Sequence, residues 1–376
     1  MSEAPHRPIV PPATIGMLGG GQLGRYALIA ARTMGFRTMV LEPDPNAPCG
    51  KIADVHLVAP YDDPDALERL GDECAVVTAE FENPPAAALE SLARRTFVAP
   101  SPASVAVAQD RIAEKRFLTD AGLPVGPHAV IRSDRDDPDI GYPAILKTAR
   151  LGYDGKGQRL VDDGSGMRAA WRLLGGVPCV LERALELQLE VSVVVARTAD
   201  GSFAAYPVTE NHHVDGILDL SVAPARVRPK LADRAVGLAM TIADALDYVG
   251  VLAVEFFVVD GELLVNELAP RPHNSGHWTL DVAQTSQFEQ QVRAVCGLPL
   301  GDTSMTRRAA AMVNLLGDEW DDGEPRWVNG LRSYDSLHLY GKAVARPGRK
   351  MGHLTAWGAS VEEAELRALD ARRSLR

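Results

Sequence analysis

The sequence predicts an α/β unit followed by an α+β region, and two patterns in its 376 residues indicate this. Over about the first 108 residues, short apolar strands alternate with helical stretches, which is typical of a parallel sheet covered by helices. From about Glu190 onward, paired apolar runs flank Asp-Gly turns, which is typical of antiparallel hairpins. The chain is too long for one hydrophobic core, so we expect two or three packed domains.

The first predicted unit, residues 1–108, opens with a strand over Thr14 to Leu18. The glycine-rich turn Gly19 to Gly24 follows, and a helical pattern runs over Arg25 to Met34. The remaining elements alternate in the same way: strands over 36–41, 52–58, 75–78 and 96–99, and helices over 64–70 and 84–93. We therefore expect a parallel sheet in this unit.

A charged amphipathic helix over Val105 to Ala121 leads into the second predicted unit, residues 109–300. The helix ends at Gly122, and the prolines that follow are typical of a domain junction. The further elements of this unit are strands over 144–148 and 179–182, a helix over 167–174, hairpins that join 191–197 to 203–206 and 251–259 to 263–268, and helices over 233–246 and 287–295.

The third predicted unit, residues 301–376, is less regular. Apolar runs over 309–315, 333–340 and 351–356 suggest a small sheet. The segment 361–374 is typical of a closing helix, because its basic last turn suits the helix dipole.

Composition excludes several classes of protein. The formal net charge of −11 argues against nucleic acid or an anionic membrane surface as the main partner. No apolar run approaches the roughly 20 residues of a membrane helix. The Pro-rich start lacks the apolar core of a signal peptide, so we expect no export. Four scattered cysteines lack the spacing of a zinc site, and reduced structural thiols in the cytoplasm are expected.

The first glycine loop has the pattern of a dinucleotide-binding turn. Gly19, Gly21 and Gly24 follow a strand and open a helix, and Glu42 ends the next strand, where a ribose-binding acid would stand. Such a turn directs backbone N–H groups at any phosphate. A turn that only packs the helix against the sheet fits the pattern equally well, so both interpretations stay open.

A second glycine-rich loop carries its own cations. Residues 152–158 read Gly-Tyr-Asp-Gly-Lys-Gly-Gln and follow the strand that contains Lys147. Glycines let the backbone approach a polyphosphate, and Lys147 and Lys156 supply charge to offset it. The loop lacks the Gly-Lys-Ser/Thr ending of a Walker motif. Taken by itself, it could also be a hairpin turn with solvated lysines.

Two glutamates lie on adjacent strands of one predicted hairpin. A three-residue loop, 260–262, places Glu255 directly opposite Glu267, whereas a two-residue loop shifts the pairing by one. Opposed carboxylates on an apolar sheet repel each other unless a cation lies between them, and with Asn266 beside them they suit Mg²⁺. The alternative is that either Glu lies on an exposed face or pairs with Arg271. The segment after the hairpin, 270–279, is dense in hydrogen-bonding groups, and Arg271 there can clamp a small anion such as bicarbonate.

These motifs, in this order, resemble the ATP-grasp superfamily, and more closely its N5-carboxyaminoimidazole ribonucleotide synthetases. The matching blocks run over nearly the whole chain: 19–25, 80–83, 109–111, Lys147 with 152–158, Glu182 with Glu190, 210–213, 266–277, 286–289, 340–342 and 349–353. The resemblance implies an ATP-grasp fold with an N-terminal Rossmann-like parallel-sheet domain, a lid subdomain at about 124–186 and a small C-terminal domain.

The resemblance also implies a role for each matching residue. ATP would be enclosed by Arg111, Lys147, Gly152, Tyr153, Asp154, Gly155, Lys156, Gly157, Gln158, Glu182, Arg183, Ala184 and Leu185, with Glu190 on the ribose and His213 near the nucleotide. Glu255 and Glu267 would bind two Mg²⁺ ions, which Mn²⁺ can replace, with Asn266 beside them. The ribonucleotide would contact Gln22, Leu23, Glu80, Asn83, Asp154, His273 and Asn274, and its phosphate would lie near Lys342, Arg349 and Lys350. The residues closest to the chemistry would be Arg271, Lys147, Tyr153, Asp154, His273 and Asn274.

The implied reaction is the ATP- and bicarbonate-dependent carboxylation of 5-aminoimidazole ribonucleotide through carboxyphosphate, in purine biosynthesis. The resemblance further implies a homodimer and a functional link to an N5-carboxyaminoimidazole ribonucleotide mutase. One departure is the run Glu182 to Leu185, where the family has a more acidic and aromatic run, and we expect altered nucleotide affinity at most.

Three other functions compete with this one. Another ATP-grasp ligase, such as a formate-using ribonucleotide transformylase or a biotin-dependent carboxylase subunit, shares the nucleotide motifs, but the blocks 270–277 and 349–353 count against it. An NAD-dependent oxidoreductase would use the first glycine loop and leave Glu255 and Glu267 without a purpose. A non-catalytic nucleotide sensor would not need the complete set of Lys, Glu and Asn ligands.

Overall fold

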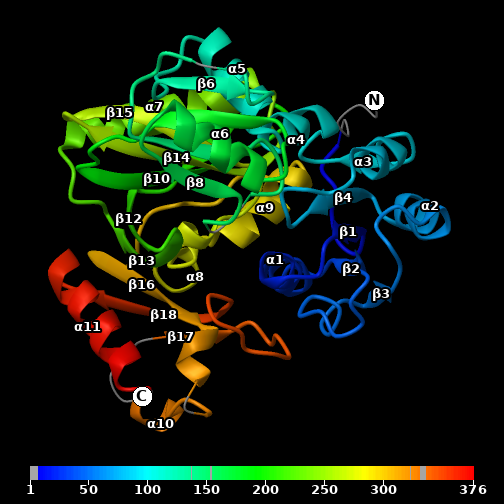
Figure 1. Ribbon diagram of the computed structural model, residues 1–376. Helices are drawn as coiled ribbons and strands as arrows, with labels where there is room; N and C mark the ends of the chain where they lie inside the picture. Colours follow the sequence, from blue (N-terminus) through cyan, green and yellow to red (C-terminus); the bar gives the residue numbers. More distant parts are fainter. Residues whose placement is uncertain (1–6, 137, 153–154, 322, 331–335) are drawn as a thin grey trace.

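The computed structural model of the chain describes residues 7–136, 138–152, 155–321, 323–330 and 336–376. Its strands form three sheets, which lie in successive parts of the sequence (Figure 1). The tips of these sheets and the loops between them surround one cavity.

The N-terminal sheet has five parallel strands in the order β3-β2-β1-β4-β5. The strands are β1 (Thr14–Leu18), β2 (Arg37–Leu41), β3 (Val55–Leu57), β4 (Val76–Ala79) and β5 (Phe97–Val98). Helix α1 (Gln22–Thr33) packs on one face with α9 (Gln287–Val295), and α2 (Pro64–Glu73) and α3 (Ala86–Ala93) pack on the other. The predicted parallel sheet is therefore confirmed, and α1 begins three residues earlier than we expected.

The second sheet is antiparallel and has the order β6-β9-β7-β8. Its strands are β6 (His128–Ile131), β7 (Ala144–Thr148), β8 (Gln158–Val161) and β9 (Cys179–Arg183), and α6 (Gly164–Leu173) covers one face. The second glycine loop joins β7 to β8, so its ends are held by paired strands.

The third sheet has nine strands in the order β15-β14-β10-β12-β13-β16-β18-β17, with β11 beside β10. The strands are β10 (Leu189–Arg197), β11 (Phe203–Ala205), β12 (Thr209–Val214), β13 (Ile217–Ala223), β14 (Gly250–Val259), β15 (Glu262–Ala269), β16 (Ala309–Leu316), β17 (Ser336–Leu339) and β18 (Lys350–Gly358). Helix α7 (Pro229–Ala245) packs on the strands of the two predicted hairpins. Short helices η1 (Asn274–Gly276) and α8 (Thr279–Val282) follow β15, while η2 (Gly317–Trp320), α10 (Trp327–Gly330) and α11 (Val361–Arg373) lie near the C-terminus.

Two predictions from the sequence need correction. The last strands pair with one another as expected, but they do not form a small sheet of their own, because β13 pairs with β16 and makes them part of the nine-stranded sheet (Figure 1). The single helix expected over 105–121 is two helices, α4 (Pro102–Ala108) and α5 (Arg111–Asp120). Asp110 breaks the helix because it adopts an extended conformation and its carboxylate accepts the N–H groups of Ile112 and Ala113 at 2.9 and 3.3 Å.

Two further properties follow from the described residues. All four cysteines are buried and unpaired. Within the described part of the chain, every helix is too short or too polar to cross a lipid bilayer.

Candidate active site

A cavity of about 970 Å³ opens between the N-terminal sheet, the nine-stranded sheet and the segment 342–350. It gathers predicted site residues from distant parts of the sequence. Those that line it are Gln22, Leu23, Glu80, Asn83, Arg111, Gly152, Lys156, His213, Glu255, Glu267, Arg271, His273, Asn274, Lys342, Arg349 and Lys350. The fold thus places the predicted nucleotide, metal and ribonucleotide residues around one space.

The other predicted residues that the structure describes are not part of the lining of this cavity. They are Lys147, Gly155, Gly157, Gln158, Glu182, Arg183, Ala184, Leu185, Glu190 and Asn266. Lys147 and Glu182 form a buried ion pair of 2.8 Å, and Glu190 lies 3.0 Å from the Nδ1 atom of His213. Tyr153 and Asp154 lie outside the described residues.

The two glutamates of the β14–β15 hairpin face each other. This is the pairing expected for a three-residue loop, but the loop has only two residues. Val259 pairs with Glu262, so the turn has two residues, Asp260 and Gly261, with positive φ angles of 52° and 76°. A β-bulge between Glu255 and Phe256 restores the register by accommodating Asn266 as an extra residue of β15. Glu255 consequently lies opposite Glu267.

The opposed glutamates differ in electrostatic environment. Burial, together with the negative charge of Glu267, raises the pKa of Glu255 to about 7. Burial acts in the same direction on Glu267, but the guanidinium of Arg111, which donates to its Oε2 at 3.0 Å, outweighs it and lowers the pKa of Glu267. The side-chain oxygen of Asn266 is buried and has no hydrogen-bond partner.

Helix α5 supplies two cations to this region from one face, because Arg111 and Lys115 are four residues apart. Lys115 is 3% exposed, and its Nζ atom donates to the carbonyl of Asn266 at 2.8 Å and lies 3.6 Å from Glu182. Burial raises the pKa of Glu182, but the neighbouring lysines Lys147 and Lys115 lower it to about 2. Sequence reasoning missed Lys115, which its helical spacing from Arg111 could have revealed.

The histidine that follows the hairpin is held firmly. His273 N–H donates to Gln287 Oε1 at 2.9 Å, and Gln287 Nε2 donates to the carbonyl of His273 at 2.7 Å. The Nε2 atom of His273 lies 3.2 Å from Glu255, and burial lowers the pKa of this imidazole well below its usual range. Beside it, the amides of Asn274 and Asn314 pair at 2.7 Å.

The first glycine loop is occupied by the protein's own carboxylates. The N–H groups of Gly21 and Gly24 donate to Glu80 at 2.7 and 3.1 Å, and the N–H of Gly20 donates to Glu42 at 2.8 Å. Burial raises the pKa of Glu80 even though these N–H groups oppose the shift. The amides expected to cradle a phosphate are therefore already satisfied, which removes the basis for a dinucleotide site at this turn.

Three further cations of the cavity, Arg271, Lys342 and Arg349, are fixed by protein contacts. Arg271 donates to a carboxylate oxygen of Glu82 and to the carbonyl of Pro272. In the segment 342–350, Lys342 donates to the carbonyl of Lys350 at 2.6 Å. Arg349 donates to the carbonyl of Val344 at 2.8 Å. These contacts hold three basic side chains in the lining of the cavity.

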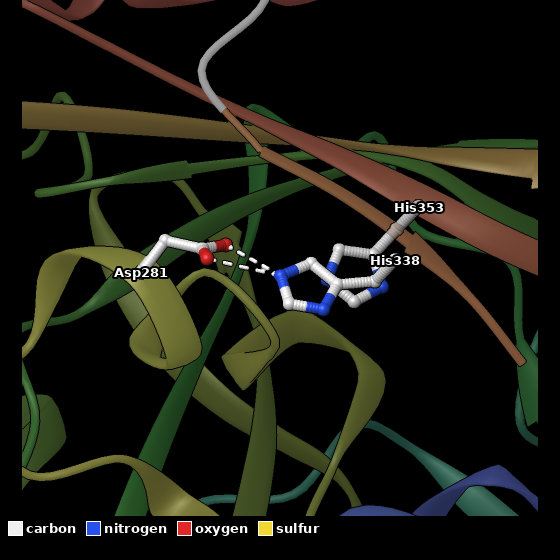
Figure 2. A group of neighbouring side chains, drawn as sticks. All are labelled: Asp281, His338 and His353. Atoms are coloured by element: carbon white, nitrogen blue, oxygen red, sulfur yellow. Dashed lines mark hydrogen bonds and ion pairs between the residues drawn. The ribbon is translucent and has the colours of Figure 1, made fainter. Parts of the chain in front are cut away.

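Asp281 of α8 and the histidines His338 and His353 form a group of neighbouring side chains (Figure 2). The Nε2 atom of His338 is 2.9 Å from a carboxylate oxygen of Asp281, and the rings of His338 and His353 stack with centroids 4.5 Å apart and planes 15° apart. Nitrogen lone pairs lie in the ring plane, so two stacked imidazoles do not converge on one tetrahedral cation. His353 instead bonds the hydroxyl of Tyr340 through Nδ1 at 2.9 Å, and we assign the group to packing.

Comparison with known proteins finds a match for three parts of the chain. Residues 12–109 match the ribonucleotide synthetase preATP-grasp domain, 116–288 the ATP-grasp domain and 310–367 the phosphoribosylaminoimidazole carboxylase C-terminal domain. An N5-carboxyaminoimidazole ribonucleotide synthase from Brucella melitensis is 45% identical over 356 residues, which cover 92% of this chain and 96% of the relative.

Solved structures agree with this match. An ADP complex of an N5-carboxyaminoimidazole ribonucleotide synthetase aligns with a TM-score of 0.91 and 41% identity over 97% of this chain and 98% of the other. An N5-carboxyaminoimidazole synthase from Aspergillus clavatus, in complex with ADP and 5-aminoimidazole ribonucleotide, aligns with a TM-score of 0.86 and 30% identity over 96% and 98% of the two chains.

Proposed function

This chain belongs to the family of N5-carboxyaminoimidazole ribonucleotide synthases, ATP-dependent ligases of purine biosynthesis, and on this premise we propose how its residues use ATP and bicarbonate to carboxylate 5-aminoimidazole ribonucleotide. Its fold is an ATP-grasp domain with an N-terminal preATP-grasp domain and a C-terminal domain. The observation that carries the proposal is the opposed pair Glu255 and Glu267, which faces a cavity that also collects basic groups from three parts of the chain.

The nucleotide is proposed to lie between the second sheet and the β14–β15 hairpin. ADP is present in solved relatives, and the partly buried Arg111 together with the buried Lys115 and Lys147 offsets polyphosphate charge here. The remaining contacts are proposed for the glycine loop at Gly152 and 155–158, for Glu182 to Leu185, and for Glu190 and His213 at the ribose.

The acidic pair is proposed to hold Mg²⁺, and the residues fit this ion. Two facing carboxylates and the unpartnered oxygen of Asn266 supply hard oxygen donors, which Mg²⁺ prefers. Glu255 and Glu267 would hold two ions, or Mn²⁺ in their place. When bound, the metal would neutralise charge on the transferred phosphoryl group.

The ribonucleotide is proposed to lie on the opposite side of the cavity, along the N-terminal domain. Its phosphate cannot use the first glycine loop, because Glu80 and Glu42 already occupy those amides. Lys342, Arg349 and Lys350 supply positive charge instead. The ribose and base are left to Gln22, Leu23, Glu80, Asn83, His273 and Asn274, which line the same space.

Chemistry follows in two steps. An oxygen of bicarbonate attacks the γ-phosphorus of ATP, the bond to the bridging oxygen of ADP breaks, and carboxyphosphate forms. The exocyclic amine of the ribonucleotide then attacks the carboxyl carbon, phosphate leaves, and the amine loses a proton. Arg271, held by Glu82, is proposed to orient the anionic intermediate, while the glycine loop excludes water that would hydrolyse it.

The test is ADP release with ATP, Mg²⁺ and bicarbonate, with and without 5-aminoimidazole ribonucleotide. We expect the ribonucleotide to stimulate ADP release and Glu267→Gln to lower the stimulated rate by about 100-fold or more. Glu262→Gln is the matched control, since it makes the same change on the same strand at an exposed position and should retain activity within about two-fold. Turnover that ignores the ribonucleotide would contradict the proposed acceptor.

Further proposals rest on the family resemblance. We propose structural units at 1–108, 109–300 and 301–376, with a lid at about 124–186. We also propose a cytoplasmic homodimer that hands its product to an N5-carboxyaminoimidazole ribonucleotide mutase. Sedimentation of the chain alone would test the homodimer, and sedimentation of the chain mixed with the mutase would test their association.

A further inference from the structure

The turn between β12 and β13 reaches into the cavity. Val214 pairs with Ile217, so Asp215 and Gly216 form a two-residue turn with positive φ angles of 52° and 78°. Both flanking strands belong to the nine-stranded sheet. Gly216 and Ile217 line the cavity.

On one side, this turn touches the glycine loop, and its shortest contacts there are between backbone atoms. A Cβ atom on Gly155 would lie 2.9 Å from the carbonyl oxygen of Asp215, and a Cβ atom on Gly216 would lie 2.9 Å from the Cα atom of Gly155. Both glycines have positive φ angles. Because backbone meets backbone, any side chain at Gly216 must push the two segments apart.

On the other side, the turn touches the segment that carries the basic residues of the C-terminal part. The Cδ1 atom of Ile217 lies 3.1 Å from the place that a Cβ atom on Gly348 would take. The N–H of Gly348 donates to Asp318 at 2.8 Å, which anchors this segment to η2. Gly348 precedes Arg349 and Lys350, so the contact lies next to the proposed phosphate site.

From these two contacts we infer that the Asp215–Gly216 turn is a positioning element that couples the loop over the nucleotide to the segment that binds the ribonucleotide phosphate. The inference rests on the proposed function, because it assigns a nucleotide to one side and a ribonucleotide to the other. A ligand that shifts either segment also shifts the turn through these contacts, and the turn then favours the bound arrangement of the other segment. Coupling of this kind is reciprocal in binding, so each substrate raises the affinity for the other.

The variant that tests the inference is Gly216→Ala, and the chain supplies a matched control for it. The β14–β15 turn, Asp260 and Gly261, has φ angles of 52° and 76°, nearly the same as those of the Asp215–Gly216 turn. At Gly261, a Cβ atom would approach only the end of the flexible Arg228 side chain, at 3.3 Å. Gly261→Ala therefore imposes the same backbone strain as Gly216→Ala without touching the glycine loop.

The experiment measures affinity for 5-aminoimidazole ribonucleotide with and without a non-hydrolysable ATP analogue and Mg²⁺. We expect the analogue to raise this affinity by about five-fold or more in the natural chain and in Gly261→Ala, and by less than about two-fold in Gly216→Ala. Ile217→Ala, which removes the contact on the other side, should also lower the coupling. Thermal unfolding confirms that each variant is folded.

The outcomes separate the inference from the function. Full coupling in Gly216→Ala, or an equal loss in Gly261→Ala, would overturn the role of the turn while leaving the reaction intact. Failure of the natural chain to bind the ribonucleotide would instead overturn the proposed function.

Discussion

At the scale of single residues, two buried histidines should make stability depend on pH. His277 and His353 are fully buried, and burial lowers the pKa of His277 to about 3 and that of His353 well below its usual range. An unfolded histidine binds a proton near pH 6.5, whereas these folded ones do not. The unfolded state therefore binds more protons as the pH falls below about 6.5, and stability is lost in that direction.

We predict that His353→Asn removes part of this dependence. The asparagine can still bond Tyr340, since its side chain reaches the position of Nδ1. Between pH 7 and pH 5, the natural chain should lose about 2 kcal/mol more of its free energy of unfolding than the variant does. Urea unfolding at both pH values measures this difference, and equal losses in the two proteins would refute the prediction.

The acidic pair shows how far single residues could be predicted. Glu255, Glu267 and Asn266 could be recognised as candidate metal ligands from their residue types, because opposed carboxylates on an apolar hairpin need a cation. Their register was not, since the Asp-Gly turn by itself shifts the pairing by one and only a bulge restores it. Bulges depend on packing against neighbouring strands, which one sequence does not display. Lys115 was missed for a similar reason, because its burial comes from β9 and β15.

At the scale of secondary structure, the capping aspartate of α5 should matter for both stability and nucleotide binding. Asp63 caps α2 in the same way, by accepting the N–H of Ala66 at 2.8 Å. Asp110→Ala and Asp63→Ala should each cost about 1 kcal/mol of stability. Only Asp110→Ala should also raise the KM for ATP several-fold, because α5 begins with Arg111. Chemical denaturation and initial rates measure these effects, and equal KM values in the two variants would speak against this role of α5.

Secondary structure was predictable where the signal is local. The parallel strands, the two Asp-Gly hairpins and α9 lie where their patterns placed them, because turn chemistry and periodicity act over a few residues. The helix over 105–121 was predicted as continuous because its apolar periodicity runs through Asp110. The sequence shows that Asp110 can cap a helix. Whether the chain turns there depends on the contacts of the second helix, here the bond from Arg111 to Glu267.

At the scale of the whole molecule, the continuous sheet predicts that the C-terminal part is needed for folding. β16 covers the edge of β13, and α11 packs against both β16 and β18. A chain that ends at Asp302 would expose Leu220 and Val222, which are buried in the intact chain. Each such side chain contributes about 1.5–3 kcal/mol when buried, and a domain has only about 5–15 kcal/mol of stability in total.

We therefore expect the truncated chain to lose cooperative unfolding and to aggregate. Near-UV circular dichroism and a thermal scan provide the measurement, and a truncated chain with native spectra and a sharp transition would show the prediction to be wrong. This dependence could not be predicted from local patterns, because strands β13 and β16 pair across a long separation along the chain.

The first glycine loop has a consequence for how such patterns are interpreted in other proteins. Here the side chains of Glu80 and Glu42 act as internal ligands for the amides that a dinucleotide phosphate would otherwise bind. A glycine fingerprint therefore describes a set of donors and does not identify the acceptor. An acidic residue at the end of a neighbouring strand can be that acceptor, and genome-wide searches for nicotinamide enzymes should treat such a residue as a competing explanation.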